Sequence, residues 1–158
     1  MINLWKERNW GPMLLKEIDK PFDSKDYIFE LKFDGIRAVI FANKKSVKIQ
    51  SRNKLDMTHL FPELQKISEL VDKNVIFDGE IVAFENNKDS FSKIQERIHL
   101  KNKDKIKNAA IEKPVTFIAF DILYENKNLT TLPLTERKDY LNKYTENDYF
   151  VKSKVIDT

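Results

Sequence analysis

The chain has 158 residues, of which 28 are Lys or Arg and 25 are Asp or Glu, so its formal net charge is only +3. A hydrophobic fraction of 41%, with 11 Phe, supplies a core for one domain and excludes a wholly disordered chain. No apolar run is long enough to span a bilayer, and no signal-peptide stretch is present, so we expect a cytoplasmic protein without a membrane partner. Cysteine is absent, which excludes disulfides, thiol nucleophiles and Cys-ligated zinc.

Strand patterns dominate the first half of the chain. Residues 27–31 and 36–41 are rich in β-forming side chains, and a turn at 43–46 leads into the alternating run 47–51. These three runs predict a hairpin or meander. Apolar residues then recur at helical spacing after Thr58, which we interpret as an N-cap, with Pro62 near the helix start.

The run 75–84 is predicted to be a buried strand with one internal glycine. After a turn at 85–89, Ser90 is predicted to cap an amphipathic helix whose apolar stripe is Phe91, Ile94 and Ile98. The lysine-rich stretch 101–113 is predicted to be a solvated, mobile face, with a nucleic-acid contact as the alternative.

The last third completes the fold class. Residues 115–123 form a further strand pattern, Thr135 is predicted to cap a short helix that ends near Lys143, and 149–156 predicts a last strand. Strands joined by turns and short helices predict an α+β domain with mostly antiparallel sheets.

One polar segment, Lys32-Phe-Asp34-Gly35-Ile-Arg37, lies where one predicted strand ends and the next begins. Read simply, it is a turn with Gly35 at its corner and both basic residues exposed. A lysine whose pKa is lowered by burial or by neighbouring cations can instead act as a nucleophile, because only the neutral amine attacks. Arg37 would then supply a fork for phosphate oxygens, and the pair suggests a lysine that attacks a phosphate.

The extended segment Glu30–Arg37 resembles the nucleotidyltransferase motif of ATP-dependent DNA ligases. Three further segments resemble later motifs of that family, in the same order, namely Ser51-Arg52-Asn53, Phe77-Asp78-Gly79-Glu80 and Phe117–Leu123. Two less specific segments, Gly11–Leu14 and Leu132–Lys138, are similar to bacterial and archaeal ligase sequence. The resemblance covers nearly the whole chain and implies a nucleotidyltransferase (ATP-grasp-like) adenylation domain over residues 1–158.

The resemblance also implies roles for individual residues. Lys32 would be the nucleophile that forms a covalent lysyl-AMP with ATP in the presence of Mg²⁺ or Mn²⁺. The nucleotide would be bound by side chains that offer stacking, hydrogen bonds or charge, namely Glu30 at adenine, Arg37 and Arg52 at ribose or phosphate, Glu80 at ribose or a metal-bound water, and Phe120 on the adenine face. Supporting roles would fall to Asp34, Gly35, Asp78 and Asp121.

Taken singly, some of these residues have simpler interpretations. Phe120 alternates within an apolar strand and alone would be assigned to the core, and Arg52 alone would be an ordinary surface residue. A lone carboxylate such as Glu80 is costly to bury without a partner, which favours a functional role. His59 and His99 show no metal-ligand spacing and are predicted to be structural or exposed.

The implied activity is DNA ligation in three steps: lysyl-AMP forms on Lys32, AMP passes to the 5′-phosphate of nicked duplex DNA, and the 3′-hydroxyl displaces AMP. The E-G motif, the lysine-rich motif and the OB-fold domain that follow the aromatic strand in such ligases are not found. We therefore expect the front part of an adenylation domain, with feeble or no self-adenylation and an exposed sheet edge open to self-association.

Two other classes remain open from the sequence. RNA-capping guanylyltransferases and RNA ligases share the lysine chemistry, although capping enzymes tend to carry a small hydroxyl residue where Phe33 stands. RNA ligases often lack the full D-G-x-R. A truncated nucleotide-binding or DNA-binding module without catalysis is the second class.

Overall fold

The computed structural model describes residues 3–8 and 10–156, and its centre is a five-stranded sheet. The strand order is β3-β2-β4-β7-β8, with bounds β2 Ile36–Asn43, β3 Ser46–Ser51, β4 Val75–Val82, β7 Thr116–Glu125 and β8 Phe150–Lys152. All neighbours are antiparallel except β7 and β8, which are parallel. The predicted α+β class with mostly antiparallel sheets is confirmed.

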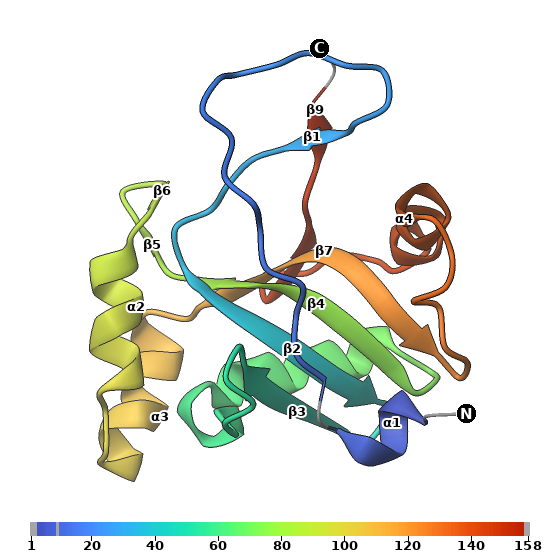
Figure 1. Cartoon of the computed structure of the whole chain (residues 1–158). Helices are drawn as coiled ribbons and strands as arrows, with labels where there is room; N and C mark the ends of the chain where they lie inside the picture. The colour runs from blue at the N-terminus through green and yellow to red at the C-terminus, as the bar shows by residue number, and fades with distance from the viewer. Residues whose placement is uncertain (1–2, 9, 157–158) are drawn as a thin grey trace.

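Helices surround this sheet on several sides (Figure 1). Figure 1 shows α2 and α3 at one side of the sheet and α4 at the other. The helical elements are α1 Leu4–Glu7, the 3₁₀ segments η1 Thr58–Leu60 and η2 Pro62–Leu70, α2 Phe91–Ile98, α3 Lys103–Glu112 and α4 Leu134–Asn142. Along the part of the chain that is described, no helix is long and apolar enough to cross a bilayer.

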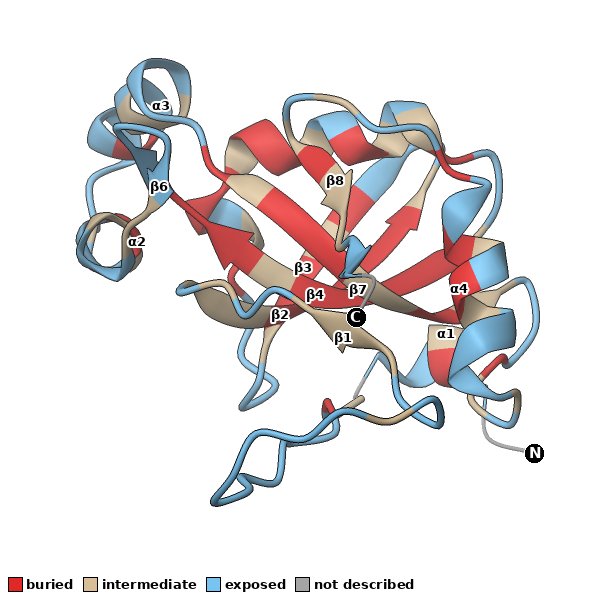
Figure 2. Cartoon of the chain, turned by 90° about the horizontal axis from the view of Figure 1, so that it is seen from above, coloured by how far each residue is buried: buried red, intermediate tan, exposed pale blue. Residues whose placement is uncertain are grey.

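Two short sheets complete the fold. Strands β1 Phe29–Glu30 and β9 Val155–Ile156 pair antiparallel and lie above the main sheet in Figure 1. Strands β5 Phe84–Glu85 and β6 Lys88–Asp89 form a hairpin beside α2. The chain running from α1 to β1 is largely exposed, as the pale-blue loop in Figure 2 shows.

The two faces of the main sheet bury different clusters. One face carries the large core, which includes Phe61, Phe77 and Phe117, all fully buried. The other face carries a small cluster of Leu4, Val39, Phe41, Ile76 and Leu123, packed under α1 and the tryptophans. Strands β2 and β4 are buried along most of their length, as their red colour in Figure 2 shows. Burial on both faces explains why their sequences are nearly continuous apolar runs.

A buried ion pair joins three of the helical segments. Arg97 of α2 donates to both carboxylate oxygens of Glu63 in η2, at 2.8 and 3.2 Å, and to the carbonyl of Leu60. Glu63 also accepts from the Val115 amide, just before β7. Both charges are thus paired and hydrogen-bonded, as burial requires.

Several predicted details of the first half were wrong. The segment after Thr58 forms 3₁₀ turns instead of an α-helix, and Thr58 is not its cap, because its hydroxyl accepts from the Ile49 amide of β3. Strand β1 pairs with β9, so residues 27–31 belong to no hairpin with 36–41. The hairpin between β2 and β3, turning at 43–46, is confirmed.

In the second half, 101–113 contains a helix, α3, capped by the Asn102 side chain, which accepts from the Asp104 and Lys105 amides. Helix α4 begins at Leu134 after Pro133, so Thr135 is not its cap. The predicted last strand is two strands in different sheets, β8 and β9. The division of the last strand depends on tertiary pairing, which local patterns do not reveal.

Candidate functional site

Lys32 is exposed and lies in the loop that joins β1 to β2. The neighbouring charge is the carboxylate of Glu80, at the end of β4 that faces this loop, and Coulombic attraction to Lys32 and Arg37 acts on it. The Lys32 ammonium is therefore near enough to the Glu80 carboxylate for their charges to interact.

Gly35 allows this loop to lie directly on β4. A Cβ atom there would be 2.2 Å from the Ile81 carbonyl oxygen and 2.9 Å from Glu80 Cγ. No described glycine has a positive φ, so the need for glycine is close approach and not turn conformation. Gly35 is therefore needed because its backbone lies against β4, and not only because it stands at the corner of a turn.

Arg37 is held in place by two acceptor oxygens. Its Nε and Nη2 donate to Asp78 Oδ1 and Oδ2 at 2.7 and 2.8 Å, and its guanidinium lies over the Phe120 ring, 4.9 Å from the centroid. Burial opposes the charge, but the bond to Asp78 and the carboxylates of Glu80 and Asp121 raise the pKa of Arg37. Arg37 is thus a fixed cation, with Asp78 as its support.

Glu80 pairs with Arg37 across β4 and β2, so both side chains point from the same face of the sheet. Burial raises the pKa of the Glu80 carboxyl, and the nearby Asp78 charge adds to this rise. Arg37, Lys32 and the Gly35 amide act in the opposite direction without cancelling it. Glu80 is therefore a half-buried carboxylate with unusual affinity for a proton.

A β-bulge brings Phe120 and Asp121 to this face together. Asp78 pairs with Asp121 and Gly79 with Ala119, which leaves Phe120 as the extra residue of β7. Gly79 is required there because a Cβ would be 2.2 Å from the Ile118 carbonyl oxygen. The half-buried Phe120 ring therefore faces Arg37 and is not part of the core.

Helix α4 contributes two basic residues that we did not assign to the site from the sequence. Arg137 donates to Asp121 Oδ1 and Oδ2 at 2.8 and 2.7 Å, and Lys138 donates to the carboxylate of Glu30 in β1. The bond to Asp121 raises the pKa of Arg137. The segment Leu132–Lys138 resembles ligase sequence, but that resemblance assigned no role to Arg137 or Lys138.

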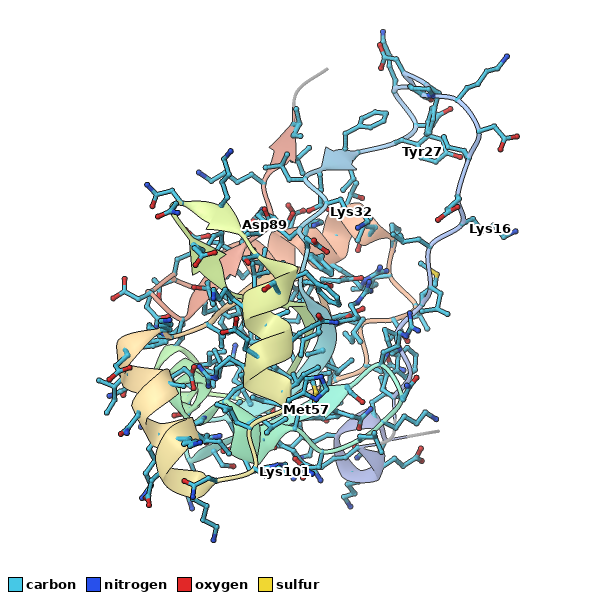
Figure 3. All side chains as sticks on the ribbon, turned by 90° about the vertical axis from the view of Figure 1, so that its left-hand side faces the viewer. Lys16, Tyr27, Lys32, Met57, Asp89 and Lys101 are labelled. Carbon is cyan, nitrogen blue, oxygen red and sulfur yellow. The ribbon has the colours of Figure 1, made fainter. Side chains whose placement is uncertain are left out.

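A third residue missed from the sequence is Asp89 of β6. Its Oδ2 accepts from the backbone amide of Asp34 at 2.6 Å, which ties the Lys32 loop to the hairpin of β5 and β6. Figure 3 labels Lys32 and Asp89 close to each other, above α2. No motif pointed to Asp89, because the contact joins residues 55 positions apart.

Arg52 stands apart from the other predicted residues. It is exposed and follows β3 directly, and since Ser51 pairs with Ala38, it lies level with Arg37 at that end of the sheet. Within the described ranges its side chain makes no ion pair or hydrogen bond. His59 and His99 are exposed, as predicted.

Most carboxylates on the sheet face that carries Arg37 and Glu80 bind basic side chains. On this face Asp78 is bound by Arg37 and Asp121 by Arg137, while Glu30 of β1 is bound by Lys138. Glu80 is therefore the carboxylate of this face that a divalent cation would meet. Residues 3–8 and 10–156 contain no cluster of three or more metal-ligating side chains. One carboxylate still fits Mg²⁺, which is commonly held by one or two carboxylates together with substrate phosphates.

Comparison with known proteins gives a consistent result. A family model described as ATP dependent DNA ligase domain matches residues 12–158. The chain is 35% identical to the SPbeta prophage-derived DNA ligase-like protein LigB of Bacillus subtilis, over 84% of this chain and 46% of that protein. It is 38% identical to a DNA ligase of Methanococcus vannielii, over 85% of this chain and 24% of that one.

Among solved structures, mycobacterial DNA ligase D complexed with ATP and MES is similar, with a TM-score of 0.67 and 26% identity. The match covers 82% of this chain and 40% of that chain. The ligase domain of LigD from M. tuberculosis gives a TM-score of 0.66 at the same identity and coverage. The chain spans less than half the length of each of these relatives.

Proposed function

The chain belongs to the ATP-dependent DNA ligase domain family, and on that premise we propose that it binds ATP and takes AMP onto Lys32. The observation that carries this proposal is the placement of an exposed lysine over a sheet face that presents Phe120, Arg37 and Glu80 together. These side chains offer an apolar ring, a fixed cation and a carboxylate to one ligand.

The proposed first step is a displacement at the α-phosphorus of ATP. The neutral amine of Lys32 attacks phosphorus, a P–N bond forms, and the P–O bond to pyrophosphate breaks. The nitrogen loses one proton to solvent, pyrophosphate leaves and lysyl-AMP remains. Mg²⁺ or Mn²⁺, when bound, would neutralise phosphate charge during this step. Glu80 is the residue that would hold such an ion or its water.

The binding roles follow from the side chains. Phe120 would stack on adenine with the ring face that Arg37 does not cover, and Glu30, oriented by Lys138, would contact the purine edge. Arg37 and Arg52, level with each other on β2 and after β3, would contact ribose or phosphate. Asp34, Gly35, Asp78 and Asp121 would support these groups.

In the whole ligase, AMP would pass from Lys32 to the 5′-phosphate of nicked duplex DNA, and the 3′-hydroxyl would then displace AMP. Contacts to the phosphate backbone would suit such an enzyme, because a nick must be sealed whatever its sequence. Such work would place the protein inside the cell with the DNA. The family match favours this reading over RNA capping and RNA ligation.

Intact-mass spectrometry after incubation with ATP and Mg²⁺ tests the proposal. We expect only a small fraction of the wild-type chain to gain the mass of one AMP, because this front part of an adenylation domain should self-adenylate feebly. Lys32→Ala should gain none, and GTP should be a poor donor. Lys44→Ala is the control, because Lys44 is exposed in the turn between β2 and β3, away from the candidate site. Equal labelling of wild type and Lys32→Ala would contradict the assignment.

We also propose that the chain self-associates through the small sheet of β1 and β9. The main sheet is protected at its β3 edge, where the Gln65 side chain bonds both the amide and the carbonyl of Val47. Val155 and Ile156 of β9 are exposed apolar residues at an edge strand. A molecular mass that does not change with concentration in solution scattering would refute this.

A further inference from the structure

The loop that carries Lys32 is held from outside at both of its ends. On the upstream side, the carboxylate of Glu30, two residues before Lys32, receives a hydrogen bond from Lys138 of α4. On the downstream side, the amide of Asp34, two residues after Lys32, donates to Asp89 of β6. Lys32 therefore lies midway along a five-residue segment that two distant elements hold.

The downstream contact is short and charge-assisted. The distance from the Asp34 nitrogen to Asp89 Oδ2 is 2.6 Å, and hydrogen bonds to ionised acceptors are about twice as strong as neutral ones. Asp89 ends a tight hairpin in which Asn86 and Asn87 adopt left-handed φ values of 52° and 63°. The carboxylate is thus presented by a defined turn next to the loop.

The upstream contact is enclosed. Lys138 is only 8% exposed, so its ammonium needs a partner, and Glu30 supplies it. The preceding residue, Arg137, fixes the same helix to β7 through two bonds to Asp121. Helix α4 therefore connects the main sheet to β1 and the Lys32 loop.

Resting on the proposed role of Lys32 as the nucleophile, we propose that Asp89 and Lys138 are positioning residues that fix the Lys32 loop for attack. An amine that reacts with a bound phosphate must be held at a near-attack geometry, and small misplacements are costly. The backbone on either side of Lys32 lies outside regular secondary structure, so these two contacts supply the order that a strand would otherwise give.

The first test compares rates of AMP uptake. We expect Asp89→Ala to lower the maximal rate about ten- to a hundredfold, while the ATP concentration for half-maximal rate stays unchanged. Asp89→Asn keeps an acceptor oxygen and should recover most of the rate. The control is Asp56→Ala, because Asp56 likewise accepts a backbone amide, that of Thr58 at 2.9 Å, away from the loop.

The second test needs no turnover. Hydrogen exchange of the Asp34 amide should accelerate about tenfold in Asp89→Ala, and exchange over residues 29–31 should accelerate in Lys138→Met but not in Lys138→Arg. Lys73→Met, which removes the longer 3.7 Å pair with Glu125, should leave both regions unchanged. Amides within β2 and β4 report whether a variant has lost its fold.

The two proposals fail in different ways. A wild-type chain that takes up no AMP contradicts the proposed function, and the exchange comparison then still decides whether the two contacts hold the loop. A wild-type chain that takes up AMP while Asp89→Ala matches its rate and exchange overturns the positioning role. Unchanged exchange in both Asp89→Ala and Lys138→Met overturns it whether or not AMP is taken up.

Discussion

The Glu80 carboxyl binds a proton more readily in the folded chain than in water, because its pKa is raised. Its carboxyl is half buried beside Arg37 and Lys32, and burial raises its pKa above the ordinary value of 4.5. The folded chain therefore holds this proton at a pH where the unfolded chain has released it. Stability contributed by the protonated group is present below pH 4.5 and is lost as the pH rises through the folded-state pKa.

We therefore expect Glu80→Gln to increase the free energy of unfolding at pH 7. The gain should shrink as the pH falls and disappear below about 4.5, where wild type is itself protonated. Urea unfolding of both proteins across this pH range measures the difference. Glu112→Gln, on an exposed residue of α3, is the control and should show no such trend.

Phe120 gives a prediction about ligand binding. Replacing Phe120 by Ala should weaken ATP binding by about 1 to 3 kcal/mol, because aromatic stacking on a base contributes that much. Phe120→Trp should keep the affinity. Calorimetric titration with ATP measures both, and Phe91→Ala, at a partly exposed phenylalanine of α2, should bind as wild type does. Equal affinity of Phe120→Ala and wild type would show that the base lies elsewhere.

At the scale of elements, two glycines decide how closely β4 packs. A Cβ at Gly35 or Gly79 would lie 2.2 Å from a carbonyl oxygen of the neighbouring backbone, which cannot turn aside as a side chain can. Gly35→Ala and Gly79→Ala should each destabilise the chain by at least about 2 kcal/mol. Thermal unfolding measures this. Gly11→Ala is the matched control, since its Cβ would meet only Lys54 Cε at 3.6 Å.

The strength of each sequence pattern explains which strands and helices could be predicted. Strands β2, β4 and β7 could be predicted because their runs are long, apolar and rich in β-branched residues, and β3 because polar and apolar residues alternate along it. Helix α3 was missed because lysines alternate with its few apolar residues and only Ile106 is buried. Such a short apolar pattern is hard to recognise as a helix among so many charged residues.

At the scale of the whole molecule, the buried pair of Arg97 and Glu63 holds the helical layer together. Arg97→Met alone should cost about 3 to 5 kcal/mol, because it leaves the Glu63 charge buried without its partner. The double variant Arg97→Met, Glu63→Leu should recover much of that loss. Urea unfolding separates these outcomes, and Lys66→Met, which breaks an exposed pair with Glu69, should change little.

The candidate site shows the limit of sequence reasoning at this scale. Lys32, Arg37, Glu80 and Phe120 were predicted as site residues because each lies in a short motif, and the sheet brings the last three to one face. Asp89, Arg137 and Lys138 were assigned no role, since each acts across a contact between elements distant in the chain. Pattern and resemblance identify local segments, whereas the supporting bonds depend on how those segments pack.

The bulge in β7 makes the candidate site sensitive to the deletion of a single residue during evolution. Phe120 and Asp121 share a face only because β7 has one residue more than β4 at that point. Losing a single codon there would restore regular pairing and leave a foldable sheet, yet it would remove an aromatic ring or an acid from the face of the candidate site. A one-residue gap at this position in an aligned sequence would therefore identify a relative that keeps the fold but has lost a side chain of the candidate site.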